Sequence, residues 1–174
     1  MDRIKVFISY SHDSEEHKQK VLDLATKLIE WGIDCELDQF LEGTPTEGWP
    51  RWMVNQLENV DFVLIVNSEI YKERFEGRAP EGKGQGGKWE GAIITQQLYE
   101  AEMNNTRFIP VVFNFEDTKH IPLVLRAASY YNISVDSQFE NLYRYLTNQP
   151  KILKPHLGER RILETGINLK KNND

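Results

Sequence analysis

The chain of 174 residues contains little cysteine, no long apolar run and no excess of basic residues. Its single cysteine, Cys35, excludes an intrachain disulfide and suits a reducing compartment. No apolar run approaches the roughly 18–20 residues of a membrane-spanning helix, and the first residues leave no room for a signal peptide. The formal net charge of −6 argues against a general nucleic-acid binder, which needs a basic face. We therefore expect a cytoplasmic domain that contacts neither membranes nor nucleic acids.

Motifs for metals and phosphates are also missing. The four histidines, His12, His17, His120 and His156, show no metal-ligand spacing. The glycine-rich stretch 82–88 departs from a phosphate-binding loop, because Trp89 follows Lys88 where Ser or Thr would hold magnesium. It is interpreted as a plain glycine-rich loop, with a lid over a site as the alternative. A phosphoacceptor domain would need acids where Ser9 and Asn67 stand. We expect neither a metal nor a bound cofactor.

Short apolar runs alternate with amphipathic helical segments along the chain. Strands are predicted at residues 4–8, 33–38, 62–66, 107–113 and 130–135, and helices at 13–31, 49–57, 89–105 and 139–146. This alternation predicts an α/β fold, a parallel sheet with helices on both faces. Pro110 argues mildly against a central position for the fourth strand. Residues 69–88 are predicted to be a charged loop.

The chain is predicted to hold one domain. The alternating pattern extends to about Pro150, so residues 1–150 are assigned to the domain. Beyond this point the pattern gives way to charge pairs and isolated aliphatic residues. Residues 151–174 are therefore assigned to a C-terminal tail or linker.

Glu90 is the strongest catalytic candidate. It stands in the first turn of the predicted helix 89–105, beside the apolar stripe that contains Ile94 and Leu98. That turn lies near the carboxyl edge of the sheet, where α/β proteins bind ligands, and the helix dipole keeps a carboxylate ionised there. Such a group can hold ribose hydroxyls and stabilise an oxocarbenium-like charge. The plainer interpretation is a surface acid at a helix N-terminus.

Further candidates follow predicted strands or flank the loops between the elements. They are the substrate-binding candidates Ser9, Tyr10, Ser11, Asp38, Trp49 and Trp89. Strand ends of a parallel sheet meet at one edge, so we expect these residues and the loop 41–48 to border one cleft with Glu90. Asp38 and the tryptophans also have a structural interpretation, as a cap or turn residue for Asp38 and as core residues for the tryptophans.

Seven sequence blocks in order carry a resemblance to a known family. They are VFISYS (6–11), WGID (31–34), LDQ (37–39), PRWM (50–53), DFVLIV (61–66), GKWEG (87–91) and FIPV (108–111). On these blocks the chain resembles a bacterial SEFIR domain, a relative of the TIR domain, over about residues 4–148. The resemblance implies a flavodoxin-like, TIR-like three-layer sandwich with a five-stranded parallel sheet. It also implies a role in cytoplasmic signalling or immune defence, including defence against phage.

The resemblance further implies one of two activities. Many bacterial and plant TIR domains cleave NAD+ at the nicotinamide–ribose bond, using a Glu on the helix after the third strand. In their pattern this Glu follows the tryptophan by four positions, where this chain has Ile93. Here Glu90 directly follows Trp89, one turn earlier on the same helix face. The resemblance thus implies an NAD+ glycohydrolase with NAD+ as its substrate and Glu90 as its catalytic carboxylate.

Two other functions stay open. Animal SEFIR and TIR adaptors mostly perform no chemistry and pair with like domains, so a non-enzymatic homotypic interaction module is the main alternative. An enzyme that cleaves another N-glycoside is a third possibility. For both the NAD+ hydrolase and the adaptor, the expected protein partner is a like SEFIR or TIR domain.

Overall fold

A computed structural model describes residues 3–78, 85–102 and 104–166, with the backbone alone for residues 85–90. Five parallel strands form one sheet in the order β2-β1-β3-β4-β5. The strands are β1 (Lys5–Ser9), β2 (Asp34–Glu36), β3 (Phe62–Val66), β4 (Phe108–Val112) and β5 (Tyr131–Asn132). The predicted α/β fold is therefore confirmed, and each strand lies inside or next to its predicted run.

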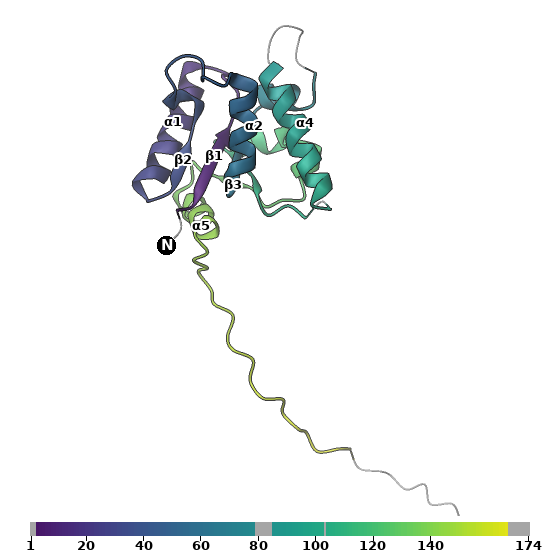
Figure 1. Cartoon of the computed structure of the whole chain (residues 1–174). Helices are drawn as coiled ribbons and strands as arrows, with labels where there is room; N and C mark the ends of the chain where they lie inside the picture. Colours follow the sequence, from purple (N-terminus) through teal and green to yellow (C-terminus); the bar gives the residue numbers. More distant parts are fainter. Residues whose placement is uncertain (1–2, 79–84, 103, 167–174) are drawn as a thin grey trace, which may run out of the picture.

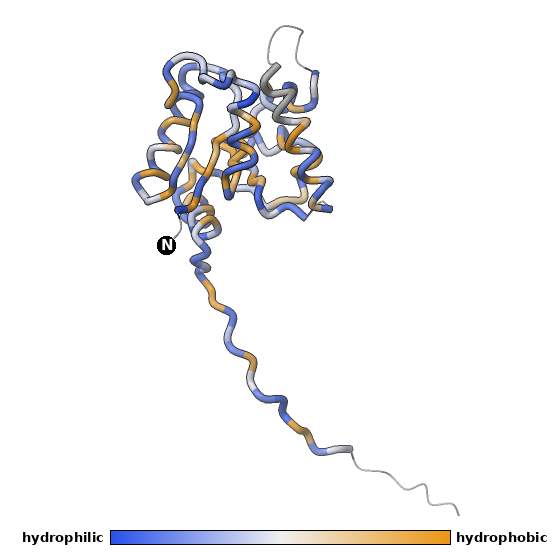
Figure 2. Tube along the Cα trace, viewed as in Figure 1, coloured by the Kyte–Doolittle hydropathy of each residue, from blue (hydrophilic) through white to orange (hydrophobic). Residues whose placement is uncertain are grey.

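Helices cover both faces of this sheet (Figure 1). They are α1 (Glu15–Glu30), α2 (Trp49–Asn59), α3 (Glu69–Phe75), α4 (Gln85–Glu100) and α5 (Asp136–Leu146), with short 3-10 helices η1 (Asp38–Phe40), η2 (Phe115–His120) and η3 (Leu123–Leu125). One core cluster joins α1 and α5 to one face, and a second joins α2, α3 and α4 to the other. Figure 2 shows the hydrophobic residues gathered along the strands and the inner sides of the helices.

Residues of one strand divide between these two core clusters. Val6 and Ile8 of β1 pack on the α1 side, whereas Phe7 between them packs on the α2 side. Side chains alternate across a strand, so a strand buried on both faces must be apolar throughout. This is why the central strand β3, from Phe62 to Val66, is a continuous apolar run.

Pro110 lies in β4, which has a neighbouring strand on each side, so the objection to a central position was wrong. The backbone N–H groups of Val63 and Asn67 donate to the carbonyl oxygens of Arg107 and Val111, each at 2.9 Å. The backbone N–H and C=O groups of odd-numbered residues in β4 therefore point toward β3. Those of even-numbered residues, and with them the nitrogen of Pro110, point toward β5. Since β5 pairs with β4 only at Val111 and Val112, the missing N–H removes no bond of the β3–β4 ladder.

The segment predicted as a charged loop contains helical structure, so that prediction was wrong. Helix α3 begins after Ser68, whose hydroxyl accepts a hydrogen bond from the Tyr71 backbone N–H at 3.2 Å. Its seven residues are too few to display a clear hydrophobic period. Helix α4 begins at Gln85 and takes in Gly86 and Gly87, although glycine is a poor helix former. Residues 82–84 of the glycine-rich stretch lie outside the described residues.

The chain beyond α5 differs from the rest. Residues 151–166 form no helix or strand, and all of them are exposed. They extend away from the sheet in Figure 1. None of the helices in the described part of the chain has the length and apolar character needed to cross a membrane.

Candidate functional site

Buried polar side chains gather where β1 and β3 end. Ser9, Ser11, Asn67 and Ser68 are between 1% and 7% exposed. The hydroxyl oxygens of Ser9 and Tyr71 lie 2.7 Å apart, and those of Ser11 and Ser68 lie 3.2 Å apart. Buried polar groups are stable only when hydrogen-bonded, so these contacts tie the two strand ends to the start of α3. The predicted residues Ser9 and Ser11 therefore lie at the carboxyl edge inside a hydrogen-bonded cluster.

Tyr10 joins a second cluster, on the opposite face of the sheet from Ser9. Its hydroxyl donates to Asp38 Oδ1 at 2.7 Å and accepts from Gln39 Nε2 at 2.9 Å. The Nε2 atom of His12 lies 2.7 Å from Asp38 Oδ2. The structure thus brings together the predicted residues Tyr10 and Asp38, whereas strand alternation points Ser9 to the other face. His12 and Gln39 were not among the predicted site residues. The only sequence signal for them was their position next to predicted residues.

Electrostatics fix the roles in the Tyr10–Asp38 cluster. Burial raises the pKa of the Tyr10 hydroxyl, and the neighbouring Asp38 carboxylate raises it further, so Tyr10 stays a protonated donor. Burial by itself would raise the pKa of Asp38, but hydrogen bonds from His12 and Tyr10 outweigh it and lower this pKa. Asp38 is therefore an ionised acceptor at neutral pH that links β1 to η1.

Replacing Asp38 by Asn is expected to change the response of the protein to acid. Because folding lowers the Asp38 pKa, the stability from this carboxylate is present above its unfolded pKa of about 4 and is lost as the pH falls through the lower, folded value. Urea unfolding between pH 2 and 7 should show a smaller fall in the free energy of unfolding for Asp38→Asn than for the wild type. Parallel curves for the two proteins would contradict this role of Asp38.

Asn67 is a buried residue of this edge that the sequence alone does not identify as a site residue. Its Nδ2 donates to the carbonyl oxygens of Ile65 at 2.9 Å and Val111 at 3.1 Å, which joins the ends of β3 and β4. Within the described part of the chain its Oδ1 is buried without a hydrogen-bond partner. A polar residue directly after the most apolar strand was the available sequence signal.

The backbone of Glu90 lies in α4, while the side chains of Trp89 and Glu90 fall outside what the structure describes. The next residue, Gly91, is buried, and a Cβ atom there would lie only 2.4 Å from the backbone oxygen of Phe75. Glycine thus lets α4 pack closely on the last turn of α3. Tyr71, one turn earlier in α3, contacts Ser9. Glu90 therefore belongs to a turn of α4 that packs on the last turn of α3.

The loop 41–48 lies at the same end of the molecule as the start of α4 (Figure 1). Trp49 follows this loop, is 39% exposed and packs edge-to-face on Trp52, with ring centroids 5.6 Å apart. Trp52 in turn packs on Phe7 of β1 at 5.7 Å. Trp52 therefore belongs to the core, and Trp49 stands on it with one part of its ring system open to solvent.

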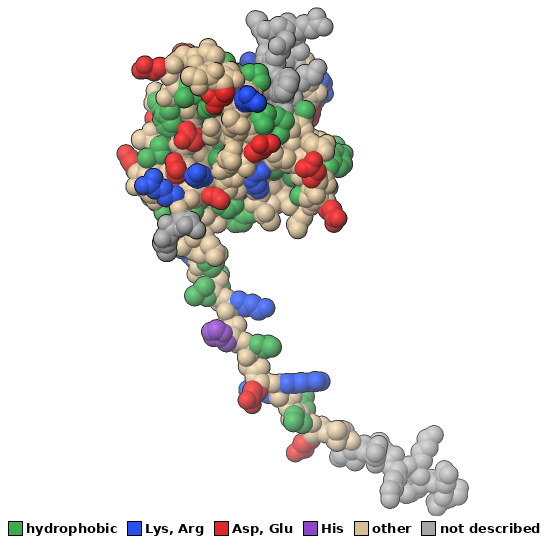
Figure 3. Space-filling model, in the orientation of Figure 1, with side chains coloured by type: hydrophobic (Ala, Val, Ile, Leu, Met, Phe, Trp, Pro, Cys, Tyr) green, Lys and Arg blue, Asp and Glu red, His purple; other side chains and the backbone are tan. Residues whose placement is uncertain are grey.

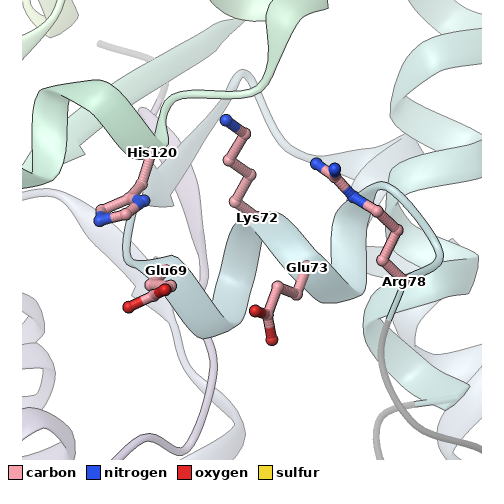
Figure 4. Close-up of a pocket in the computed structure, with 5 residues that line it drawn as sticks. All are labelled: Glu69, Lys72, Glu73, Arg78 and His120. Atoms are coloured by element: carbon pink, nitrogen blue, oxygen red, sulfur yellow. The ribbon is translucent and has the colours of Figure 1, made fainter.

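A cavity of about 430 Å³ lies between α3 and η2, near this edge. Its lining residues are Glu69, Lys72, Glu73, Arg78 and His120 (Figure 4). Figure 4 shows the two carboxylates on one side of α3 and the Lys72 and Arg78 side chains on the other. Its charges are mixed and Arg78 is paired with Glu76, so it is a solvated polar depression.

Nowhere in the described residues do three or more His, Cys, Asp or Glu side chains form a possible metal site.

A parallel five-stranded sheet with a polar carboxyl edge defines a flavodoxin-like α/β domain of the TIR-like class. The family model of the SEFIR domain matches residues 4–146, so the chain belongs to the SEFIR family and is a TIR-like signalling domain. A solved structure described as a prokaryotic SEFIR domain is similar, with a TM-score of 0.60 and 31% sequence identity. The match covers 82% of this chain and 98% of that one. No curated protein matches this chain.

Proposed function

We propose that this SEFIR domain cleaves NAD+ at the nicotinamide–ribose bond when copies of it assemble. The observation that supports the proposal is the close approach of Gly91 to Phe75, which holds the turn of α4 that contains Glu90 against α3. Proteins of this fold class bind ligands at the carboxyl edge of the sheet, and Glu90 is proposed to supply a carboxylate there. Consumption of NAD+ on assembly would give the domain a role in immune defence, including defence against phage.

The reaction is a hydrolysis. The bond between the ribose C1′ and the nicotinamide nitrogen breaks, and nicotinamide leaves with the bonding electrons as a neutral molecule. Water adds to C1′ and releases a proton, which gives ADP-ribose; attack by a group of the same molecule would give a cyclic product. The Glu90 carboxylate is proposed to stabilise the positive charge that develops on the ribose.

The remaining candidates are proposed to shape the substrate site. Tyr10 and Asp38 are hydrogen-bonded to each other, so they hold the start of the loop after β2 in place. Ser9 and Ser11 do the same for the end of β1. Trp49 and Trp89 are proposed to stack on a planar base of NAD+ or to meet a neighbouring copy.

A concentration series tests the assembly requirement. If copies complete one another's sites, nicotinamide release should rise faster than linearly with protein concentration, because association follows mass action. Trp49→Ala removes an exposed aromatic side chain and should weaken association and turnover together. Nicotinamide release can be followed by chromatography and association by sedimentation on the same samples. Turnover strictly proportional to concentration would show that the site is complete in one chain.

A non-enzymatic adaptor is the second candidate function. The observation that favours it is the exposed apolar surface of Phe40, Leu41 and Trp49, which are 44%, 36% and 39% exposed. SEFIR domains mediate homotypic interactions, and such a surface suits a contact between like domains. Self-association with no nicotinamide release at any protein concentration would favour this function over the hydrolase.

A further inference from the structure

The C-terminal segment exposes aliphatic side chains that the domain does not bury (Figure 3). Five of them are between 76% and 100% exposed: Ile152, Leu153, Leu157, Ile162 and Leu163. Apolar surface of this kind is driven out of water whenever a complementary surface is offered. The segment lies beyond residues 4–146, the part that matches the SEFIR family. The aliphatic residues of this segment are therefore not part of the hydrophobic core of the SEFIR domain.

The segment is basic, whereas the domain that carries it is acidic. Residues 151–166 contain four basic side chains, Lys151, Lys154, Arg160 and Arg161, against Glu159 and Glu164. The first 150 residues contain 15 Lys and Arg against 24 Asp and Glu. Opposite net charges favour an encounter between the segment and a domain surface.

The stretch from η1 to the start of α2 exposes both apolar and acidic side chains. We call it the loop patch, and it consists of Phe40, Leu41, Glu42, Glu47 and Trp49. Glu42 and Glu47 are exposed, and neither takes part in an ion pair with any described residue. The nearest cation along the chain is Arg51, in the first turn of α2. The loop patch thus offers an apolar surface for the aliphatic side chains of the C-terminal segment and carboxylates for its basic side chains.

The segment and the loop patch lie at opposite ends of the molecule (Figure 1). Helix α5 follows β5 and ends at Leu146 at the amino edge of the sheet, where the segment departs. The loop patch follows β2 at the carboxyl edge. A segment that docked on its own loop patch would have to run the full height of the domain. A second copy can present its loop patch to the segment without that constraint.

We propose that residues 151–163 of one copy bind the loop patch of a second copy, head to tail. Ile162 and Leu163 pack on the exposed aromatic residues of the patch, and Arg160 and Arg161 pair with Glu42 and Glu47. A head-to-tail contact joins two different surfaces, so it builds rings or open chains rather than a closed dimer. The inference extends the assembly in the proposed function, but it does not depend on NAD+ cleavage, because its readout is association alone.

Charge reversal on the full chain tests the proposal by sedimentation velocity. The wild type should form species larger than a dimer as its concentration rises, and added salt should weaken them. Arg160→Glu/Arg161→Glu and Glu42→Arg/Glu47→Arg should each raise the dissociation constant at least tenfold when studied alone. An equimolar mixture of these two variants should associate again, because each acidic segment then meets a basic patch and each basic segment an acidic one. Ile162→Ser/Leu163→Ser should weaken association without any change of charge.

Glu58→Arg/Glu100→Arg is the matched control, since it reverses two exposed carboxylates on α2 and α4 outside the loop patch. It should associate like the wild type, and circular dichroism should show all variants folded. A wild type that stays monomeric at every concentration would overturn the proposal. So would unchanged association of both reversal variants, or a mixture that fails to associate, which would assign the segment to its own domain or to another surface. Loss of nicotinamide release with association intact would count against the hydrolase alone.

Discussion

Replacing Glu90 by Gln is expected to lower the rate of nicotinamide release by about 100-fold or more, the usual effect of removing one preorganised electrostatic group from an active site. The amide is nearly the same size as the carboxylate but carries no charge, so it cannot offset the positive charge that develops on the ribose. Thermal unfolding should be almost unchanged, because the substitution keeps the shape of the side chain. Turnover is measured as nicotinamide released from NAD+ at several protein concentrations.

Glu100→Gln provides the control for this experiment. Glu100 is an exposed carboxylate at the end of the same helix and accepts a hydrogen bond from Gln96 at 3.0 Å. Its removal changes the charge of α4 equally but lies at the amino edge, away from the proposed site. Unchanged turnover in Glu90→Gln would refute the assignment of Glu90 and direct attention to Asp38, the ionised carboxylate on the other face of the same edge.

Gly91→Ala is expected to destabilise the protein, although the same change in an ordinary helix stabilises it by roughly 1 kcal/mol. The added Cβ would lie 2.4 Å from the backbone oxygen of Phe75, too close for any real contact. The added Cβ is attached to the backbone of α4 and meets the backbone of α3, so no side chain can move aside to relieve the clash. Helix α4 must therefore move away from α3 at a cost of about 1–3 kcal/mol, the usual range for overpacking. The free energy of unfolding in urea measures this change.

Ala92→Gly is the matched comparison, because Ala92 is the exposed neighbour of Gly91 on the same turn. It should lose only the helix propensity of alanine, about 1 kcal/mol. Gly91→Ala should in addition reduce nicotinamide release, since it displaces the turn that contains Glu90. A more stable Gly91→Ala protein would contradict the close approach of α3 and α4.

Local patterns were sufficient to predict the framework of the domain. The run from Phe62 to Val66 is apolar throughout because β3 is buried on both faces, and that pattern identified a central parallel strand. The start of α2 was predicted equally well, because Pro50 occupies the first turn, where its missing N–H costs nothing. Helix α3 was missed, since seven residues give no visible period and its cap, Ser68, is one serine among many.

The candidate site was predictable only as a set of positions along one edge. Residues that follow parallel strands meet at the carboxyl edge, and this rule identified Ser9, Tyr10 and Asp38 from sequence alone. The same rule did not predict which residues these side chains contact in the folded domain. The contact of Ser9 with Tyr71 and that of Tyr10 with Asp38 lie on opposite faces of the sheet, 62 and 28 residues apart in sequence.

The sequence by itself determined the strands, most of the helices, the SEFIR resemblance and the polar character of the carboxyl edge, because each depends on residues close together in the chain. Tertiary structure decided that Pro110 is tolerated inside the sheet, that Asp38 is held ionised by Tyr10 and His12, and that Gly91 lets α4 press on α3. These features depend on strand order and helix packing, which bring together groups that are distant in sequence. No local pattern encodes the distance between two such groups, since it is fixed only when the whole core packs.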